Sequence, residues 1–181
     1  KRDYPATFNY QVPWYKEYSY IEDHFARLNT VLTRGKPFVS VGVIHPVESD
    51  WIYTGPADSS SDMRCQMQEN FQNTIDWLLY GLIDFDFLSE AILSDIGSVK
   101  GNKLIAGEME YSTVIVPGCA TLRKSTIKYL KEFSRNGGKV IFCGSCPKLV
   151  DGKKSDEVKV LYENSVHIPM NRIDLLESLR D

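Results

Sequence analysis

Short β-branched runs alternate along this chain with segments whose apolar residues recur at helical spacing. The runs lie at 38–44, 82–87, 112–116, 139–142 and 165–168. The helical segments lie at 17–33, 63–80, 121–136 and 171–179, and a short helix at 87–93 competes with the end of the second run. This alternation, with short turns, predicts right-handed crossovers and a mainly parallel, doubly wound sheet. The expected fold class is α/β, a three-layer α/β/α sandwich.

Two stretches show neither the helical spacing of apolar residues nor a β-branched run. Residues 1–16 hold two prolines and several aromatic side chains without regular spacing, which indicates an extended leader. Residues 46–61 are polar and include three consecutive serines, which indicates a long loop. Asp62 then offers a side-chain cap to the helix that follows it. The expected organisation is a leader over 1–16 and a single α/β domain over 17–181.

The composition fits one globular domain of 181 residues. Charged residues make up 25% of the chain and the formal net charge is −3, so no nucleic-acid partner is expected. The apolar runs are far shorter than the roughly 20 residues that a membrane helix needs, so no membrane partner is expected. Four cysteines are too few for a secreted disulfide scaffold and favour a reducing, cytoplasmic location.

Ligands of doubly wound folds bind beyond the carboxyl ends of the strands, so the residues after each run are the candidate site residues. His45 follows the first run, with Glu48 and Asp50 close behind it in sequence. This group suits a general base with an orienting carboxylate, although a histidine that only hydrogen-bonds the turn is favoured. Trp51 lies in the same stretch and is a candidate for a ligand or interface contact.

The cysteines offer two further hypotheses. Cys143 and Cys146 have the spacing of a redox pair, but Pro147 follows directly and one pair supplies only two of the four ligands of structural zinc. An inert turn is favoured there, and no metal is expected. Cys119 follows a Pro-Gly turn before a predicted helix, whose amino terminus would activate a thiol. His167, at another strand tip, is the candidate base for it.

Motifs for nucleotides and for common hydrolases are missing. The sequence contains no G-x-G-x-x-G after a run, no G-x-x-x-x-G-K-[ST], no H-E-x-x-H and no G-x-S-x-G. No cofactor is therefore expected.

The leader is rich in aromatic side chains. Rings left in solvent favour association, so we expect them to dock against this domain or a neighbouring one. Such rings also stack on the apolar faces of sugars, so a sugar-binding platform is an alternative. The rings are those of Tyr4, Trp14, Tyr15 and Tyr18, with Phe8, Tyr10 and Tyr20 near them.

Six segments carry a resemblance to large bacterial glycoside hydrolases. They are KRDYP at 1–5, QVPWY at 11–15, YIEDHFARL at 20–28, VIHPVES at 43–49, VIVPGCATL at 114–122 and GGKVIF at 137–142. The first three resemble the stretch that leaves the catalytic barrel, and the last three look like the middle domain. That domain is similar to the trimerisation domain of family 42 β-galactosidases, whose fold is flavodoxin-like, or class I glutamine amidotransferase-like.

The resemblance implies an accessory, assembly domain without catalytic residues of its own. Cleavage of the carbohydrate then belongs to a barrel domain outside this chain, and the barrel and a homo-oligomer are the implied partners. Class I amidotransferases place their nucleophilic cysteine in a G-x-C-x-G turn, which the sequence around Cys143 and Cys146 lacks. Two alternatives stay open, a Cys-dependent amidotransferase-like hydrolase and a carbohydrate-binding module.

Overall fold

The computed structural model describes residues 8–180, apart from the side chains of 57–61. The chain divides between Phe38 and Val39 into two compact units. This boundary differs from the one expected after residue 16, because the first long helix belongs to the N-terminal unit. None of that helix's residues is buried.

The N-terminal unit consists of η1 (Tyr15–Glu17) and α1 (Tyr18–Leu32), which confirms the predicted helix. Ile21, Phe25 and Leu28 recur at i, i+4 and i+7, so they form one apolar stripe, and all three are exposed. Near the start of α1, the rings of three aromatic residues pack on one another. Their centroids lie 4.9 to 6.0 Å apart, and the residues are Phe8, Trp14 and Tyr18.

The second unit is built on a five-stranded parallel sheet. Its strands are β1 (Val41–His45), β2 (Phe85–Ser89), β6 (Thr113–Val116), β8 (Lys139–Cys143) and β11 (Val166–Ile168). They are arranged in the order β11-β8-β6-β1-β2, and every neighbouring pair is parallel. Counted along the chain, this is the order 2-1-3-4-5 of a doubly wound sheet. The predicted three-layer α/β/α sandwich is confirmed.

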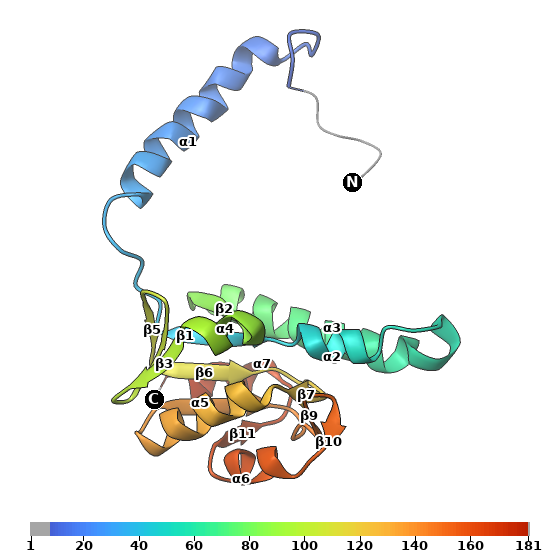
Figure 1. Ribbon diagram of the computed structural model, residues 1–181. Coiled ribbons are helices and arrows are strands. Elements are labelled where there is room, and N and C mark those ends of the chain that lie inside the picture. The colour runs from blue at the N-terminus through green and yellow to red at the C-terminus, as the bar shows by residue number, and fades with distance from the viewer. Residues whose placement is uncertain (1–7, 181) are drawn as a thin grey trace. The chain divides into compact units, whose positions relative to one another are not determined.

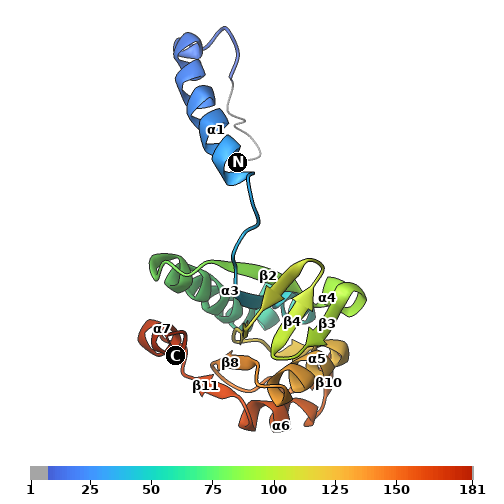
Figure 2. The same cartoon turned by 90° about the vertical axis from the view of Figure 1, so that its left-hand side faces the viewer.

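Helices cover both faces of this sheet (Figures 1 and 2). They are α2 (Val47–Ile52), α3 (Ala57–Tyr80), α4 (Glu90–Ile96), α5 (Lys124–Arg135), α6 (Glu157–Glu163) and α7 (Arg172–Ser178). One core cluster joins the sheet to α3 and α7 through Leu78 and Leu175. The other joins it to α4, α5 and α6, and includes Leu93, Phe133 and Leu161.

The strands contribute side chains to both cores, because successive side chains point to opposite faces of the sheet. In β6, Val114 and Val116 lie in the core with α5, whereas Ile115 lies in the core with α3 and α7. All three are at most 1% exposed. Burying each such side chain contributes about 1.5–3 kcal/mol, which explains why the strand reads as a continuous β-branched run.

Two small sheets were not predicted. One is antiparallel, in the order β3-β4-β5, and the other has the order β10-β9-β7. Their strands are β3 (Gly97–Lys100), β4 (Lys103–Ala106), β5 (Met109–Tyr111), β7 (Thr121–Leu122), β9 (Leu149–Val150) and β10 (Lys153–Lys154). The turns between β3, β4 and β5 depend on Gly101 and Gly107, whose φ values are +56° and +62°.

The predicted loop over 46–61 is wrong, since α2 and the first residues of α3 lie within it. Helix α3 begins after Pro56, whose ring favours the extended backbone seen there (ψ 136°). Asp62 consequently lies inside α3 and does not cap its start. No helix among residues 8–180 combines the length and apolarity that crossing a bilayer would require.

Candidate functional site

The carboxyl ends of β1, β2, β6 and β8 meet at one edge of the sheet. In a sheet of this order, the crevice where the winding reverses lies between β1 and β6, and ligands of such folds bind there. The segments that follow these strands are α2, α4 and the loops that begin at Pro117 and Gly144. They hold a buried polar network and, beside it, an open cavity.

The polar network joins three of these segments. Glu90, the first residue of α4, is completely buried, and its Oε2 accepts a hydrogen bond from the backbone N–H of Arg123 at 2.7 Å. The Arg123 side chain donates through Nε to Glu48 Oε1, also at 2.7 Å. The Arg123 guanidinium therefore pairs with a carboxylate.

Ser49 fastens α2 to the loop after β6. Its Oγ accepts hydrogen bonds from the backbone N–H groups of Ala120 and Thr121, each at 3.1 Å, and donates to the Thr121 carbonyl at 3.3 Å. The residue is 1% exposed. A buried hydroxyl with three backbone partners holds the two segments together, because its loss would remove hydrogen bonds from the interior.

The environment of Glu90 favours its protonated form. Burial is the main cause that raises the pKa of Glu90, and the Glu48 carboxylate adds to it, while the Arg123 N–H and the Thr126 hydroxyl oppose the rise. The net result is a pKa of about 7. Neither Glu90 Oε1 nor Glu48 Oε2 meets the geometry of a hydrogen bond with a described residue, although both atoms are buried. Near neutral pH this carboxyl therefore exists partly as the neutral acid.

The structure does not assemble a base from His45 and its neighbouring carboxylates. The His45 ring packs near two aromatic rings, with centroids 5.2 Å from Phe71 and 6.0 Å from Phe87. Asp50 accepts hydrogen bonds from Arg64 at 2.9 Å and from Gln68 at 3.1 Å. The Arg64 hydrogen bond holds the pKa of Asp50 below its usual value.

The two cysteines with redox spacing face different cores. Cys143, at the end of β8, packs in the cluster with α3 and α7, whereas Cys146 packs against the cluster with α5 and α6. Burial raises the pKa of both thiols. The Cys146 Sγ lies 3.6 Å from the Pro147 carbonyl oxygen, and all four cysteines are free thiols.

Cys119 lies in the turn after β6 and is 8% exposed. Burial, followed by the charges of Glu90 and Cys146, raises its pKa strongly, which is the reverse of the activation expected at a helix amino terminus. His167 is exposed on β11, where its ring stacks on Tyr162 at 5.0 Å. No hydrogen bond joins Cys119 and His167 in the part of the chain that the structure describes.

The aromatic candidates lie in both units. In the N-terminal unit Trp14 and Tyr15 are exposed and Tyr18 is half-buried, while Tyr4 falls outside the described residues. In the sandwich, Trp51 on α2 is 62% exposed. Trp51 is therefore accessible to a partner or a ligand, as are Trp14 and Tyr15.

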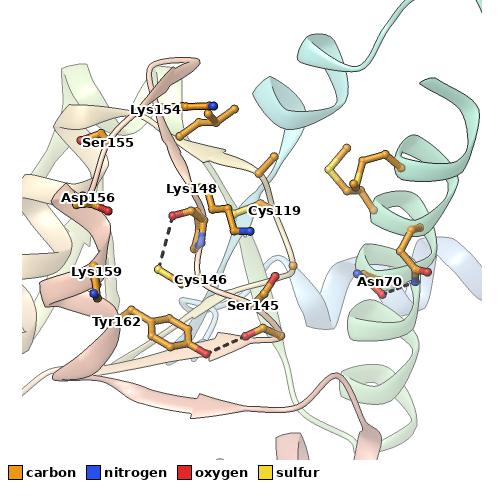
Figure 3. A pocket seen from close by; sticks show the side chains of 18 of the residues that line it. Asn70, Cys119, Ser145, Cys146, Lys148, Lys154, Ser155, Asp156, Lys159 and Tyr162 are labelled. Carbon is orange, nitrogen blue, oxygen red and sulfur yellow. Dashed lines mark hydrogen bonds between the residues drawn. The ribbon is translucent and has the colours of Figure 1, made fainter. Parts of the chain in front are cut away.

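A cavity of about 1040 Å³ opens beside the polar network (Figure 3). Helix α3 forms one wall, and the loops after β6 and β8, strand β10 and helix α6 form the others. Figure 3 shows Lys148 and Tyr162 extending into it from one side and Asn70 facing them from α3. Its lining includes Met67, Asn70, Cys119, Ser145, Lys148 and Tyr162.

The described residues contain no group of side chains suited to bind a metal ion. No group of three His, Cys, Asp or Glu side chains between residues 8 and 180 is arranged to hold a metal ion. The thiols in the cavity wall have raised pKa values, so they are poor ligands near neutral pH.

Sequence reasoning missed the most important members of this edge. Glu90 was overlooked because the second run was expected to end at Phe87, whereas β2 continues to Ser89 and places Glu90 at the strand tip. Asn70 lies on α3, far from any strand end in sequence, and Lys148 lies in the loop after β8, beyond the turn residues that the sequence singled out. Only the folded arrangement brings the two to one cavity. The correct end of β2 was the one signal that could have identified Glu90.

The fold and this edge define a doubly wound α/β protein with a buried polar network and one cavity beside it. No family model matches the chain, and no curated protein matches it. Among solved structures it is similar to the apo exo-carrageenase GH42 from Bacteroides ovatus, with 15% sequence identity and a TM-score of 0.47. The similarity covers 77% of this chain and 16% of that chain, so this chain spans about a sixth of the length of that protein.

Proposed function

We propose that this chain is a non-catalytic accessory domain of a glycoside hydrolase and that a barrel domain of the same polypeptide cleaves the carbohydrate. The observation that carries the proposal is that the polar side chains at the carboxyl edge of the sheet already form structural hydrogen bonds and ion pairs. Glu48 pairs with Arg123, Glu90 accepts the Arg123 N–H, and Ser49 fastens two backbone N–H groups. Groups held in this way serve to join α2, α4 and α5 to the sheet.

The thiols support the same function. A cysteine nucleophile needs a lowered pKa and a base within hydrogen-bond reach. Burial raises the pKa of Cys119, Cys143 and Cys146, and none of them donates to or accepts from a histidine among residues 8–180. A Cys-dependent hydrolase or amidotransferase is therefore the weaker candidate.

Helix α1 supports an assembly role. It has 15 residues, none of them buried, and helices of that length are marginally stable alone in water. Its apolar stripe holds Phe25 at 53% exposure and Leu28 at 40%. Covering this stripe with another body would stabilise the helix, and the barrel domain or a neighbouring subunit is the partner that the family resemblance favours.

The experiment tests α1 in the full product of the gene that encodes this chain. Phe25→Asp places a charge on the apolar stripe, and Thr30→Asp, on the opposite face, adds the same charge as a matched control. We expect Phe25→Asp to lower assembly and glycosidase activity at least tenfold while Thr30→Asp leaves both unchanged. Equal behaviour of the two variants, or a full product without glycosidase activity, would contradict the proposal.

A further inference from the structure

The cavity beside the polar network is not used by the accessory role. We propose that it binds a small organic anion, in which a phosphate or carboxylate group is attached to an apolar or ring-shaped body. The volume of about 1040 Å³ is ample for a molecule of this kind. The site is independent of whether the chain assists a glycoside hydrolase.

The position of the cavity is the one that this topology reserves for ligands. Its walls come from α3, which follows β1 and α2, and from the loops after β6 and β8. The reversal of winding between β1 and β6 leaves a crevice at the carboxyl ends of these strands. Segments distant in sequence thus meet around an open space, and no side chain fills it.

The charges around the cavity favour an anion. Lys148, Lys154 and Lys159 line it, and none of the three forms an ion pair within the described range. Two carboxylates, Asp156 and Glu163, also line it, about one helical turn from Lys159 on either side. Three lysines against two carboxylates leave the lining with a small excess of positive charge.

The backbone adds hydrogen-bond donors at the same wall. The N–H groups of Gly118, Cys119, Ser145 and Cys146 have no acceptor among the residues described. At Gly118 a side chain would come within 2.9 Å of Asn70 Nδ2, so glycine keeps the backbone open at that point. The donors belong to two adjacent strand ends, as in other backbone arrangements that receive anionic groups.

Most of the lining surface is apolar, which argues for an organic body on the anion. Met67, Leu149 and Tyr162 line the cavity, and the Tyr162 hydroxyl is occupied by a hydrogen bond to the Gly144 carbonyl at 3.1 Å. The thiols of Cys119 and Cys146 add neutral surface. Pockets with mostly apolar walls and a few placed polar groups fit ligands of mixed character.

A neutral sugar and a cation fit less well. A neutral sugar would form no charge-assisted hydrogen bond with Lys148 or Lys154, so these side chains would add little to its affinity. A cation would face three lysines, against two carboxylates, together with protonated thiols. The anionic ligand is the one that satisfies both the lysines and the free N–H groups.

The test uses matched pairs of probes that differ only in the anionic group. Binding to the chain is measured by calorimetry for AMP and adenosine, for glucose 6-phosphate and glucose, for benzoate and benzyl alcohol, and for inorganic phosphate alone. We expect at least one organic anion to bind tenfold or more tightly than its neutral counterpart and than inorganic phosphate. The phosphate and carboxylate arms distinguish the two possible anionic groups.

Variants locate the binding. Lys148→Met and Lys154→Met change exposed side chains of the cavity wall, and Lys128→Met changes an exposed lysine of α5 outside it. We expect the first two to weaken binding of the anion tenfold or more, and the third to leave it unchanged. Absence of an anion preference in every pair, inorganic phosphate binding as tightly as the organic anions, or equal affinity in all three variants would each overturn the proposal.

Discussion

Glu90 offers the sharpest test of the physical account, because a completely buried carboxyl couples stability to pH. Its pKa of about 7 in the folded protein lies above the value of 4.5 for an unperturbed glutamate. The folded state therefore binds this proton more tightly than the unfolded state does. The stability that the group contributes is present in full below about pH 4.5 and is lost as the pH rises through about 7.

The magnitude follows from the two pKa values. At 1.36 kcal/mol per pH unit, a rise from 4.5 to about 7 corresponds to about 3 kcal/mol, which is the cost of ionising Glu90 beside Glu48 in the interior. Glu90→Gln keeps the shape and an oxygen for the Arg123 N–H, but carries no charge at any pH. We expect the variant to be more stable than the parent by up to about 3 kcal/mol at pH 8.5 and little changed at pH 4.5.

The assay is urea unfolding followed by circular dichroism at several pH values between 4.5 and 8.5. Other carboxylates give both proteins the same background, so the quantity that matters is the difference between variant and parent. This difference should grow as the pH rises through 7. A difference that is independent of pH, or a glutamine variant that is less stable at pH 8.5, would refute the reasoning about burial.

Two further predictions concern the strand edge. Iodoacetamide should modify the exposed Cys65 rapidly at pH 8 and the buried Cys119 slowly; rapid modification of Cys119 that collapses in a His167→Ala variant would contradict this. Arg123→Met removes the partner of a partly buried carboxylate and should lower the free energy of unfolding by about 2 kcal/mol. Lys124→Met, which alters an exposed pair at 3.8 Å, should cost less than about 1 kcal/mol; equal losses in the two variants would argue against a structural role for the partly buried pair.

The architecture of the sandwich was predictable because each central strand is buried on both faces. Such strands read as continuous β-branched runs, as at 112–116 and 139–142, and the helices between them carry one apolar stripe. The segment 97–111 was not predictable in the same way. Its strands have three or four residues each, and their pairing depends on turn glycines with positive φ, which leave no periodic pattern in the sequence.

The candidate site was only partly predictable. Strand tips pointed to Glu48 and Cys119, and both lie at the carboxyl edge. The surroundings that decide their chemistry come from elsewhere: Arg123 pairs with Glu48, and burial, followed by the charge of Glu90, raises the pKa of the Cys119 thiol. Sequence spacing suggested that Cys143 and Cys146 lie together. Because the chain turns after the end of β8, the two side chains instead pack in different cores.

Turnover by the isolated chain is the measurement that tests the accessory role most directly. The purified chain is incubated with aryl glycosides and with glutamine, beside a Cys119→Ser variant that serves as the matched protein. The account predicts no hydrolysis above the uncatalysed rate for either protein. Turnover by the chain on the order of 1 s⁻¹ or faster, lost in Cys119→Ser, would contradict it.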